Sequence, residues 1–576
     1  MEGTTTMDDV IGIRGSASSV GGATGADPIT TEVIRHSLVA AVDEMKATLC
    51  RTAVSPVIYD MWDFAAALFD REMRMLGQAK SLPGFLGAMS FCIESAVAGV
   101  GGEEALKPGD VLFNTYVFDI GSHANDAAVI APAFFGGELV GYAVVKAHLL
   151  DVGAKEPYCT DTTDVFQEGT IFPGVKLYDG GEPNVDVWRI ALANSRTPGE
   201  LEADINAEIA CVRAGIDALC RIIERFGPSE FERSVELMLD HGEGVARRFF
   251  EALPDGRYRA DGMMDSDGAS EDPVPFEVQL EIKGGDLVID VTNAPATRPG
   301  PMNSPLPMTV SAARMAVMAL MGGADHVNDG YFRAVEIKVR RDTVFHPSPP
   351  APTFLFGWPA NALIDTIHRA LAAPAPTKVA AGCGGDLGAM VWYGTAEDGT
   401  FWVTYNDAPM GNGATFDGDG GAPLMHINIA TVRPASWEVF EIRAGILPEC
   451  YELTADTGGA GRFRGGNGVH IRYRMLDACF LTSVLERTKL APWGLEDGAD
   501  GLPNRMELRF PDGSTRTTPK GTRIAMPAGT VLDLWSGGGG GFGPPRERDP
   551  RSVREDIEDG YVTEAAARRD YPHALR

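Results

Sequence analysis

The chain has 576 residues, of which 80 are Asp or Glu and 50 are Lys or Arg, so its formal net charge is −30 at pH 7. This charge argues against nucleic acid or an anionic membrane surface as the main partner, because both are bound through concentrated Lys and Arg. Hydrophobic residues make up 44% of the chain, which is typical of a folded protein with a large core and excludes general disorder. Glycine, with 68 residues, exceeds its usual fraction of ~7%, and a turn-rich structure containing β-sheet is the simplest explanation.

Cysteine usage and the N-terminal sequence indicate the compartment. The eight cysteines are scattered without a CxxC pair, so neither a zinc knuckle nor a dense disulfide scaffold is expected. The first residues, MEGTTTMDDVIG, lack the basic segment and apolar core of a secretory signal. The most apolar stretches, such as 86–101, which contains Glu94, are too short or too polar to span a membrane. We therefore expect a cytoplasmic protein with reduced thiols and no membrane partner.

The N-terminal part of the chain predicts a leader, a helix and then strands. Glycine, serine and threonine dominate residues 1–26 and indicate a flexible leader. Asp27 and Pro28 begin a helix with apolar residues at three-to-four spacing, which ends between 51 and 56. From 63 to 152, apolar runs bounded by Gly, Asp or Pro predict strands, with one helix interposed near 87–100.

The middle of the chain alternates between helical and strand patterns. Residues 198–253 predict two helices separated by Gly227 and Pro228. Residues 257–295 predict strands, with a hairpin turn at Gly284 and Gly285. Helical spacing returns at 306–321 and 361–374.

Beyond Phe440 the pattern is β-rich, with glycine clusters at 458–468 and 537–543. These clusters favour tight turns over phosphate binding, because no helix with a lysine follows them. The chain as a whole predicts an α+β fold that is mixed, glycine-rich and multi-layered, with a helical segment near 198–253. We divide it into the leader, an N-terminal α+β region that holds the predicted site (27–256), a central α+β region (257–440) and a β-rich C-terminal region (441–576).

Familiar catalytic and nucleotide-binding motifs are missing from the sequence. No GxGxxG or GxxxxGK[ST] lies between a strand and a helix, and no GxSxG elbow marks a serine nucleophile. The ten histidines therefore carry most of the information about a site. His123 and His148 stand out, because the segment between them is typical of a strand, a turn at Gly136 and Gly137, and a second strand.

Pairing across this hairpin places both histidines on one face of a sheet. Counting outward from the turn, His148 lies opposite Asn125. His123 and Asn125 share a face, because side chains alternate along a strand. The two histidines are then diagonal neighbours, with β-carbons roughly 5–8 Å apart, and can share a metal ion.

Asp126 would complete a set of two histidines and one carboxylate that leaves coordination positions open for a substrate. Strict alternation points Asp126 to the other face, so a bulge or a loop at 123–126 is required. Asp151, three residues after His148, could be a further ligand or could orient one. The alternative is a pair of hydrogen-bonded histidines without a metal.

A series of short segments between about Asp27 and Tyr571 matches a known pattern in the same order. They are 27–35 (DPITTEVIR), 51–56 (RTAVSP), 63–70 (DFAAALFD), 166–169 (FQEG), 175–178 (VKLY), 456–466 (DTGGAGRFRGG), 492–494 (PWG), 537–543 (GGGGGFG) and parts of the tail from 547 to 570. Together they resemble the B-type chains of the hydantoinase/5-oxoprolinase family, which includes N-methylhydantoinase B.

The resemblance implies a metal-dependent subunit of an ATP-coupled amidohydrolase, which opens a cyclic amide such as a hydantoin, a lactam or 5-oxoproline. In this family an A-type partner phosphorylates the substrate carbonyl with ATP, and the B-type chain completes ring opening. We therefore expect a hydantoinase A-like partner in a hetero-oligomer, with ATP bound by that partner and a small molecule as the substrate.

The family's His-x-x-Asp and later histidine are similar to a metal site and fall on His123, Asp126 and His148, to which the hairpin also pointed. A divalent zinc, manganese or iron ion is expected there, where it would polarise a carbonyl or activate water. Three carboxylates are candidates for the general base or for a group that orients the site: Asp151, Glu168 and Asp63.

Departures from the family pattern leave the substrate open. Phe85 stands where the family often has a histidine, and Leu149 follows His148 where a second histidine is frequent. One alternative is a subunit of an ATP-dependent ketone carboxylase, which would take bicarbonate and form a carbon–carbon bond. The other is a non-catalytic scaffold subunit whose metal is structural.

Overall fold

The first long helix of this computed structural model shows how local sequence sets the fold. Asp27 accepts a hydrogen bond from the backbone N–H of Thr30 at 2.9 Å and caps helix α1 (Pro28–Thr52), as predicted. The apolar stripe of α1, from Ile34 to Leu49, is buried. The structure describes residues 9–15, 25–322, 326–421 and 423–575.

The other predicted helices are present with similar bounds. Gly227, at φ 83°, separates the two helices expected over 198–253. The remaining α-helices are α2 (Pro56–Tyr59), α3 (Pro83–Leu86), α4 (Met89–Gly99), α5 (Val117–Ile120), α6 (Val185–Ala193), α7 (Pro198–Phe226), α8 (Pro228–Glu251), α9 (Leu306–Met321), α10 (Gly357–Leu371), α11 (Trp437–Ala444), α12 (Pro550–Glu558) and α13 (Glu564–Asp570).

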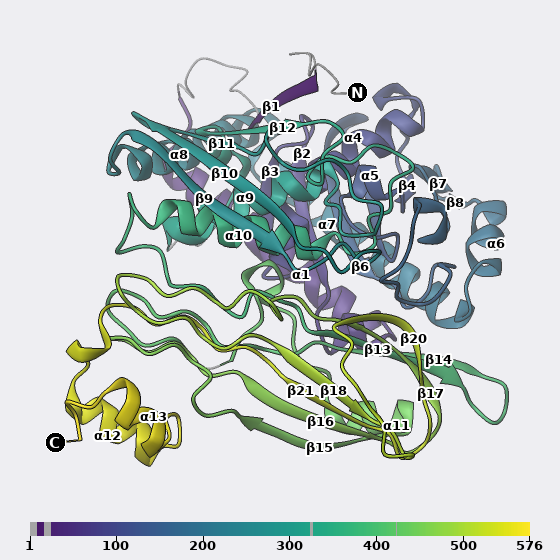
Figure 1. Cartoon of the computed structure of the whole chain (residues 1–576). Coiled ribbons are helices and arrows are strands. Elements are labelled where there is room, and N and C mark those ends of the chain that lie inside the picture. Colours follow the sequence, from purple (N-terminus) through teal and green to yellow (C-terminus); the bar gives the residue numbers. More distant parts are fainter. Residues whose placement is uncertain (1–8, 16–24, 323–325, 422, 576) are drawn as a thin grey trace, which may run out of the picture.

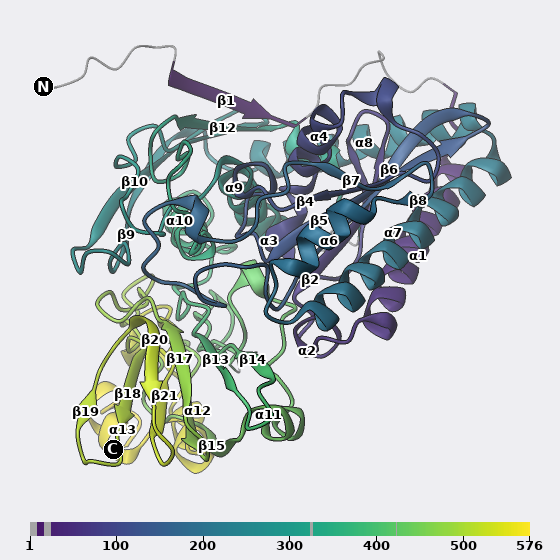
Figure 2. The same ribbon diagram turned by 90° about the vertical axis from the view of Figure 1, so that its right-hand side faces the viewer.

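A sheet of seven antiparallel strands contains the predicted hairpin. Alternate residues of its central strands enter two different hydrophobic clusters, so both faces are buried. This explains why these strands are continuous apolar runs. Helices α1 and α7 pack together on one face, as Figure 2 shows. The spatial order is β3 (Met75–Gln78), β2 (Phe64–Asp70), β6 (Glu138–His148), β5 (Asp126–Phe135), β4 (Val111–Asn114), β7 (Val175–Asp179) and β8 (Glu182–Pro183).

The central region adds a five-stranded sheet. Its order is β1 (Val10–Arg14), β12 (Val335–Arg340), β11 (Asp286–Asp290), β10 (Val274–Lys283) and β9 (Gly256–Met264). The predicted turn at Gly284 and Gly285 joins β10 and β11, and α10 packs on β9 and β10. Strand β1 departs from the prediction of a flexible leader, because it pairs antiparallel with β12; residues 1–8 and 16–24 of the leader lie outside the described residues.

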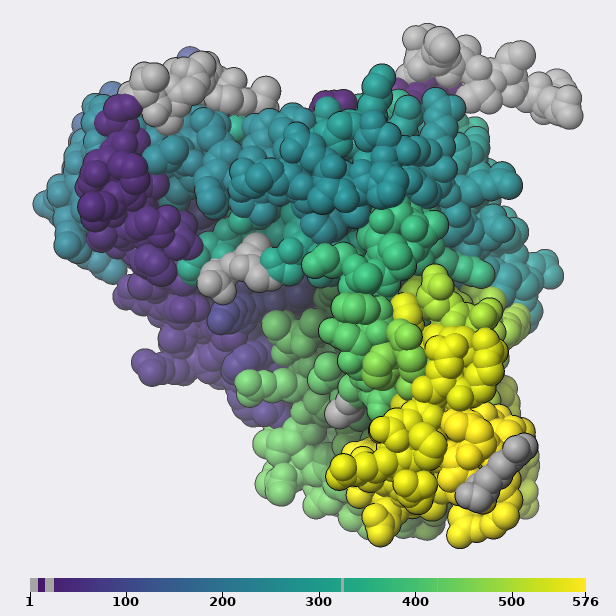
Figure 3. Space-filling model, turned by 90° about the vertical axis from the view of Figure 1, so that its left-hand side faces the viewer, coloured from purple at the N-terminus to yellow at the C-terminus, as the bar shows by residue number. Residues whose placement is uncertain are grey.

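Two further sheets form the lower part of the molecule in Figure 1. One has the order β14 (Phe401–Asn406), β13 (Ala389–Thr395), β17 (Cys479–Val484) and β20 (Lys520–Met526). The other has the order β15 (Ile446–Leu453), β16 (Val469–Met475), β21 (Val531–Trp535), β18 (Arg505–Arg509) and β19 (Thr515–Arg516). In the space-filling view of Figure 3, the C-terminal residues cover the lower part of that face.

The glycine clusters form a structure different from the tight turns that were predicted. We call the segments 380–388, 410–421, 457–468, 492–501 and 536–543 the glycine bundle. They run beside one another and are joined by lateral backbone hydrogen bonds, such as Gly539 N–H to Gly466 O at 2.9 Å and Gly459 N–H to Gly539 O at 2.8 Å. A β-carbon on Gly539 would lie 1.9 Å from the carbonyl oxygen of Asn412. Glycine is therefore required here for close approach of backbones.

The mixture of helices and mainly antiparallel sheets confirms the α+β fold class. One hydrophobic core runs through all three predicted regions and includes Leu112, Leu363 and Leu534, so the boundaries between regions stay predictions. Within the described residues, no helix has both the length and the apolar composition required to cross a bilayer.

Candidate metal centre

The hairpin that was expected to carry the site is present, but the pairing of its two strands is shifted by one residue relative to the prediction. Strands β5 and β6 turn at Gly136 and Gly137, both at positive φ, as predicted. A bulge between Ala133 and Phe134 then shifts the pairing, so that Asp126 lies opposite His148 in place of Asn125. The shift puts Asp126 and His148 on one face of the sheet.

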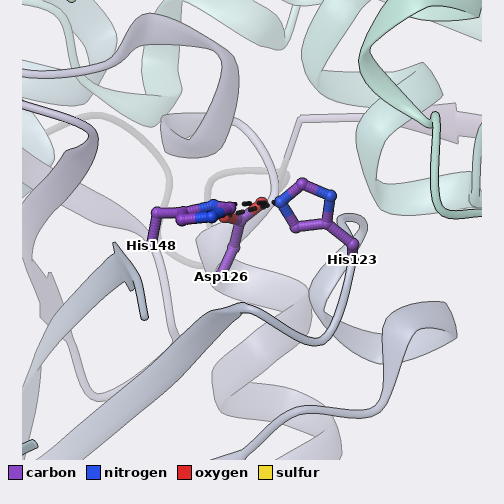
Figure 4. Close-up of side chains that lie close together, drawn as sticks. All are labelled: His123, Asp126 and His148. Atoms are coloured by element: carbon purple, nitrogen blue, oxygen red, sulfur yellow. Dashed lines mark hydrogen bonds and ion pairs between the residues drawn. The ribbon is translucent and has the colours of Figure 1, made fainter. Parts of the chain in front are cut away.

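His123 reaches these two residues from a loop. It precedes β5, and its carbonyl oxygen accepts the backbone N–H of Asp126 at 3.0 Å in a tight turn. A loop at 123–126 is one of the two alternatives, a bulge or a loop, that the sequence required for Asp126 to face the two histidines. The atoms converge as Figure 4 shows: His123 Nε2 and His148 Nδ1 lie 3.1 and 2.8 Å from Asp126 Oδ1 and 3.1 Å from each other.

Hydrogen bonding fixes which nitrogen of His123 faces the centre. The carbonyl oxygen of Phe354 can only accept, so Nδ1 of His123 donates to it at 3.1 Å and Nε2 presents a lone pair. The second oxygen of Asp126 and Nε2 of His148 are buried, and no group of the described residues forms a hydrogen bond with either. Although burial opposes ionisation, His123 and His148 hold the pKa of Asp126 below its ordinary value, so a carboxylate faces the two rings.

This arrangement fits a divalent cation. Two imidazole nitrogens and a carboxylate oxygen lie close together in a buried site. A cation bound between them would accept a lone pair from each of the three atoms. The three ligand atoms lie 2.8–3.1 Å apart, so one ion with bonds of about 2.1 Å can reach all of them.

The three side chains form part of the wall of a cavity of about 60 Å³. Two more carboxylates line it, Asp63 and Asp407, and burial raises the pKa of each to about 7. Asp63 Oδ1 has no hydrogen-bond partner. The other lining residues are mostly apolar or aromatic: Val57, Met61, Leu82, Phe85, Tyr158, Phe356, Gly357, Trp358, Leu387, Ala389, Tyr405, Asn428, Ile429 and Val432.

Of the three candidate carboxylates, Asp63 lines the cavity and the other two lie outside its lining. Asp151 is paired with Arg196, whose Nε donates to its Oδ2 at 3.1 Å, so it ties the end of β6 to the segment before α7.

Glu168 supports the site from behind. Its carboxylate accepts the backbone N–H groups of Thr353 and Phe354 at 2.8 and 2.9 Å, and hydroxyls of Thr162 and Thr353. Phe354 in turn holds His123 through its carbonyl oxygen. Glu168 therefore positions His123 through the backbone and does not touch the cavity.

Sequence reasoning missed Lys146 and Asp407. Lys146 is fully buried and donates from Nζ to Ile120 O at 2.7 Å and Ser122 Oγ at 2.8 Å, which fixes the segment that leads to His123. A lysine within the apolar run GYAVVKAH was a usable signal. Asp407 follows β14, far along the chain, and nothing in its local sequence marks it.

Comparison with known proteins places the chain among enzymes of cyclic amides. The family model described as hydantoinase B/oxoprolinase matches residues 27–545. A putative D-/L-hydantoinase chain of the B type from Pseudomonas sp. strain NS671 is 30% identical, over 95% of each chain. The beta chain of the caprolactamase of Pseudomonas jessenii is 28% identical, over 95% of this chain and 96% of that one.

Solved structures share the fold. An ATP-dependent caprolactamase from Pseudomonas jessenii superposes with a TM-score of 0.89 at 27% identity and covers 95% of this chain and 96% of its own. A nucleotide-free acetone carboxylase gives a TM-score of 0.84 at 19% identity, over 95% of this chain and 79% of its own, and this likeness concerns the fold alone.

Proposed function

The chain belongs to the hydantoinase B/oxoprolinase family, and from this premise we propose that it is the metal-dependent B-type subunit of an ATP-coupled amidohydrolase that opens a cyclic amide. One observation carries the proposal: His123, Asp126 and His148 bring three ligand atoms together at the wall of a mostly apolar cavity. Two relatives that match over nearly their whole length are named as a hydantoinase subunit and a caprolactamase subunit.

His123, Asp126 and His148 would hold a divalent zinc, manganese or iron ion. A bound ion of this kind supplies a Lewis acid for the amide carbonyl and lowers the pKa of water. All three metals accept imidazole nitrogen and carboxylate oxygen as ligands.

The cavity walls suit a small cyclic amide. Aromatic and aliphatic side chains, including Phe85, Phe356 and Trp358, would contact the methylene groups of the ring and exclude bulk water. Phe85 in particular makes this wall apolar, which favours a lactam over a more polar ring.

Two carboxyl groups of the chain are available for proton transfer. Asp63 would accept a proton from the attacking water at its unpartnered Oδ1. Asp407, whose pKa is raised to about 7 by burial and by the charge of Asp386, would return a proton to the ring nitrogen as the C–N bond breaks. Glu168 and Asp151 would position the site without touching the substrate.

We propose that ATP is handled by a hydantoinase A-like partner in a cytoplasmic hetero-oligomer. The chain has no nucleotide-binding motif and carries a charge of −30, which repels ATP. An amide carbonyl is a poor electrophile, so transfer of a phosphoryl group from ATP to its oxygen by the partner, with release of ADP, would prepare the carbon for attack by water; inorganic phosphate would leave as the product carboxylate forms. In 5-oxoprolinase 1 of Arabidopsis thaliana the region matched by this chain is 42% of a longer polypeptide, which leaves room for such a partner in the same protein.

The test is reconstitution of the chain with an A-type partner, followed by a screen of lactams, hydantoins and ketones. We expect ATP hydrolysis to be stimulated by a cyclic amide, with the ring-opened amino acid as the product. ATP hydrolysis that requires a ketone and bicarbonate would assign the carboxylase reaction to the chain. Full turnover by the partner alone would leave this chain only a scaffolding role.

A further inference from the structure

A bulge in the outer strand of the C-terminal sheet turns two potential ligands outward. Strand β15 lies at the edge of the sheet and pairs with β16 in a register that shifts between Pro448 and Cys450. Before the shift, Leu447 pairs with the outward-facing Arg474; after it, Cys450 and Glu452 lie on that outward face. Without the bulge, alternation would point both toward the core.

The bulge brings Cys450 and Glu452 to His470 on the neighbouring strand. His470 Nδ1 lies 3.7 Å from Cys450 Sγ and 3.4 Å from Glu452 Oε1, and the three atoms all lie within 4.8 Å of one another. In a tetrahedral zinc site with bonds of about 2.3 Å to sulfur and about 2.0–2.1 Å to nitrogen and oxygen, S and N are about 3.6 Å apart and N and O about 3.4 Å. We propose that Cys450, Glu452 and His470 bind a zinc-class divalent ion.

Asp533 orients the histidine for this role. Its fully buried carboxylate accepts a hydrogen bond of 2.6 Å from His470 Nε2, so the lone pair of the neutral ring lies on Nδ1, which faces Cys450 and Glu452. Trp535 stacks on the ring, with centroids 4.7 Å apart and planes at 4°. A carboxylate behind a histidine ligand is the usual arrangement at zinc sites.

The surrounding charge is compatible with a cation. Arg472 and Arg509 lie nearby, and both bind Asp533, Arg472 through Nε at 2.7 Å. With Cys450 as a thiolate, three negative groups face Arg472 and Arg509, while Arg505 stacks on Trp535 with its guanidinium 3.9 Å from the ring centroid. The side chain of Glu452 is 65% exposed, so the site opens to solvent and an ion can enter without a change in the fold.

A second cluster with the same residue types shows why the direction of the histidine matters. Asp365, Cys383 and His426 also lie close together. There, however, Nδ1 of His426 accepts the backbone N–H of Asn428 at 3.2 Å, so Nε2, which faces Asp365, carries a proton and offers no lone pair. Arg487 binds the same carboxylate at 2.6 Å. Because no histidine lone pair faces that cluster and a guanidinium does, we assign no ion to it.

The ion would fasten an edge strand. In its sheet β15 is hydrogen-bonded only to β16, and the proposed ligands come from both strands. Metal–ligand bonds between the two strands would add to their backbone hydrogen bonds and side-chain packing, and would hold β15 in the bulged register. The site contains sulfur, which distinguishes it from the centre at His123, Asp126 and His148.

Cobalt(II) distinguishes the two sites by spectroscopy. The full chain is stripped of metal with a chelator and titrated with cobalt(II), and near-ultraviolet absorption reports thiolate-to-cobalt charge transfer. We expect one cobalt per chain to produce this band, which zinc then abolishes by displacement. The band should be lost in Cys450→Ser and retained in His123→Ala and in Cys383→Ser.

The outcomes of these titrations test the proposal independently of the enzymatic activity of the chain. Absence of a thiolate band in the saturated wild-type chain would refute it, as would loss of the band in Cys383→Ser with retention in Cys450→Ser. If Cys450→Ser fails to fold, Glu452→Gln replaces it, because that side chain is 65% exposed and its substitution should leave folding intact; we expect zinc affinity to fall about tenfold or more. An unchanged affinity in Glu452→Gln would also contradict the proposal.

Discussion

The seven-stranded sheet and the glycine bundle are built on opposite principles. In the sheet, side chains on both faces fill two hydrophobic clusters, and the register of β5 and β6 decides which side chains meet. In the bundle, backbones approach so closely that a β-carbon on Gly539 or Gly465 would lie 1.9 Å from a carbonyl oxygen. The sheet, with the loop that leads into β5, therefore supplies all three proposed ligands of the metal centre, whereas the glycines of the bundle serve backbone packing. A substitution of a ligand should thus cost activity, and a substitution of a bundle glycine should cost folding.

The largest effect is expected in the sheet, from His123→Ala. The loss of one of three ligand atoms should remove the bound metal and lower turnover by about a thousandfold or more, because metal activation supplies several kcal/mol to such reactions. The measurements are elemental analysis and steady-state turnover of the reconstituted complex.

His241→Ala on α8 is the matched control for this variant, because its side chain is exposed and lies outside the cavity lining. It should keep both metal and rate. Circular dichroism should show that His123→Ala is folded. Full metal content and an unchanged rate in His123→Ala would mean that the site is wrongly assigned.

The next effect is expected in the bundle, from Gly539→Ala. The new β-carbon would overlap the carbonyl of Asn412, and the neighbouring backbones have no room to move. We expect the free energy of unfolding to fall by ~3 kcal/mol or more, or the chain to be insoluble. Chemical denaturation measures this.

Gly421→Ala serves as the control within the same bundle. Nothing lies within 4 Å of the position that a β-carbon would take there, and the φ of Gly421 is not in the left-handed region. The unfolding free energy should change by less than about 0.5 kcal/mol. If both glycine variants were equally stable, close backbone approach would not be what the bundle requires.

The two regions also differ in how far the sequence predicts them. Turn chemistry and strand alternation, which are local, predict the turn at Gly136 and Gly137 and the approach of the two histidines, whereas Asp126 joins them only through a shifted register and the loop that carries His123. The bulge at Ala133 and Phe134 has no local signal, so the register was predicted one residue away.

Long-range packing explains the remaining differences. The bundle was predicted as tight turns, because a run of glycines carries no side-chain period that could reveal lateral pairing with distant segments. Asp407 reaches the cavity only because β14 and the seven-stranded sheet meet in the folded chain. Such meetings depend on topology, and one sequence does not encode them in any local pattern.

The third prediction concerns Glu168, where the expected effect is smaller than in the first two. It distinguishes a general base from a residue that positions His123. Glu168→Ala removes the acceptor that holds the backbone of Thr353 and Phe354, and should lower turnover by about 10- to 100-fold. Glu168→Gln keeps an oxygen for these N–H groups and should restore most of the rate. Equal inactivity of the two variants would instead identify Glu168 as a general base.

The smallest effect is a pH dependence of stability that comes from the same carboxyl group. Burial raises the pKa of Glu168 to about 7, against four hydrogen bonds that lower it, from an ordinary value of 4.5. Its protonated form is thus favoured in the folded chain, and this stabilisation is fully present below pH 4.5 and is lost as the pH rises through 7. Between pH 5 and 8 the unfolding free energy of the wild type should therefore fall by up to about 2.5 kcal/mol more than that of Glu168→Gln. Urea titrations of both proteins at each pH measure the difference. If the unfolding free energies of the two proteins changed equally with pH, the four hydrogen bonds would outweigh burial and keep Glu168 ionised throughout.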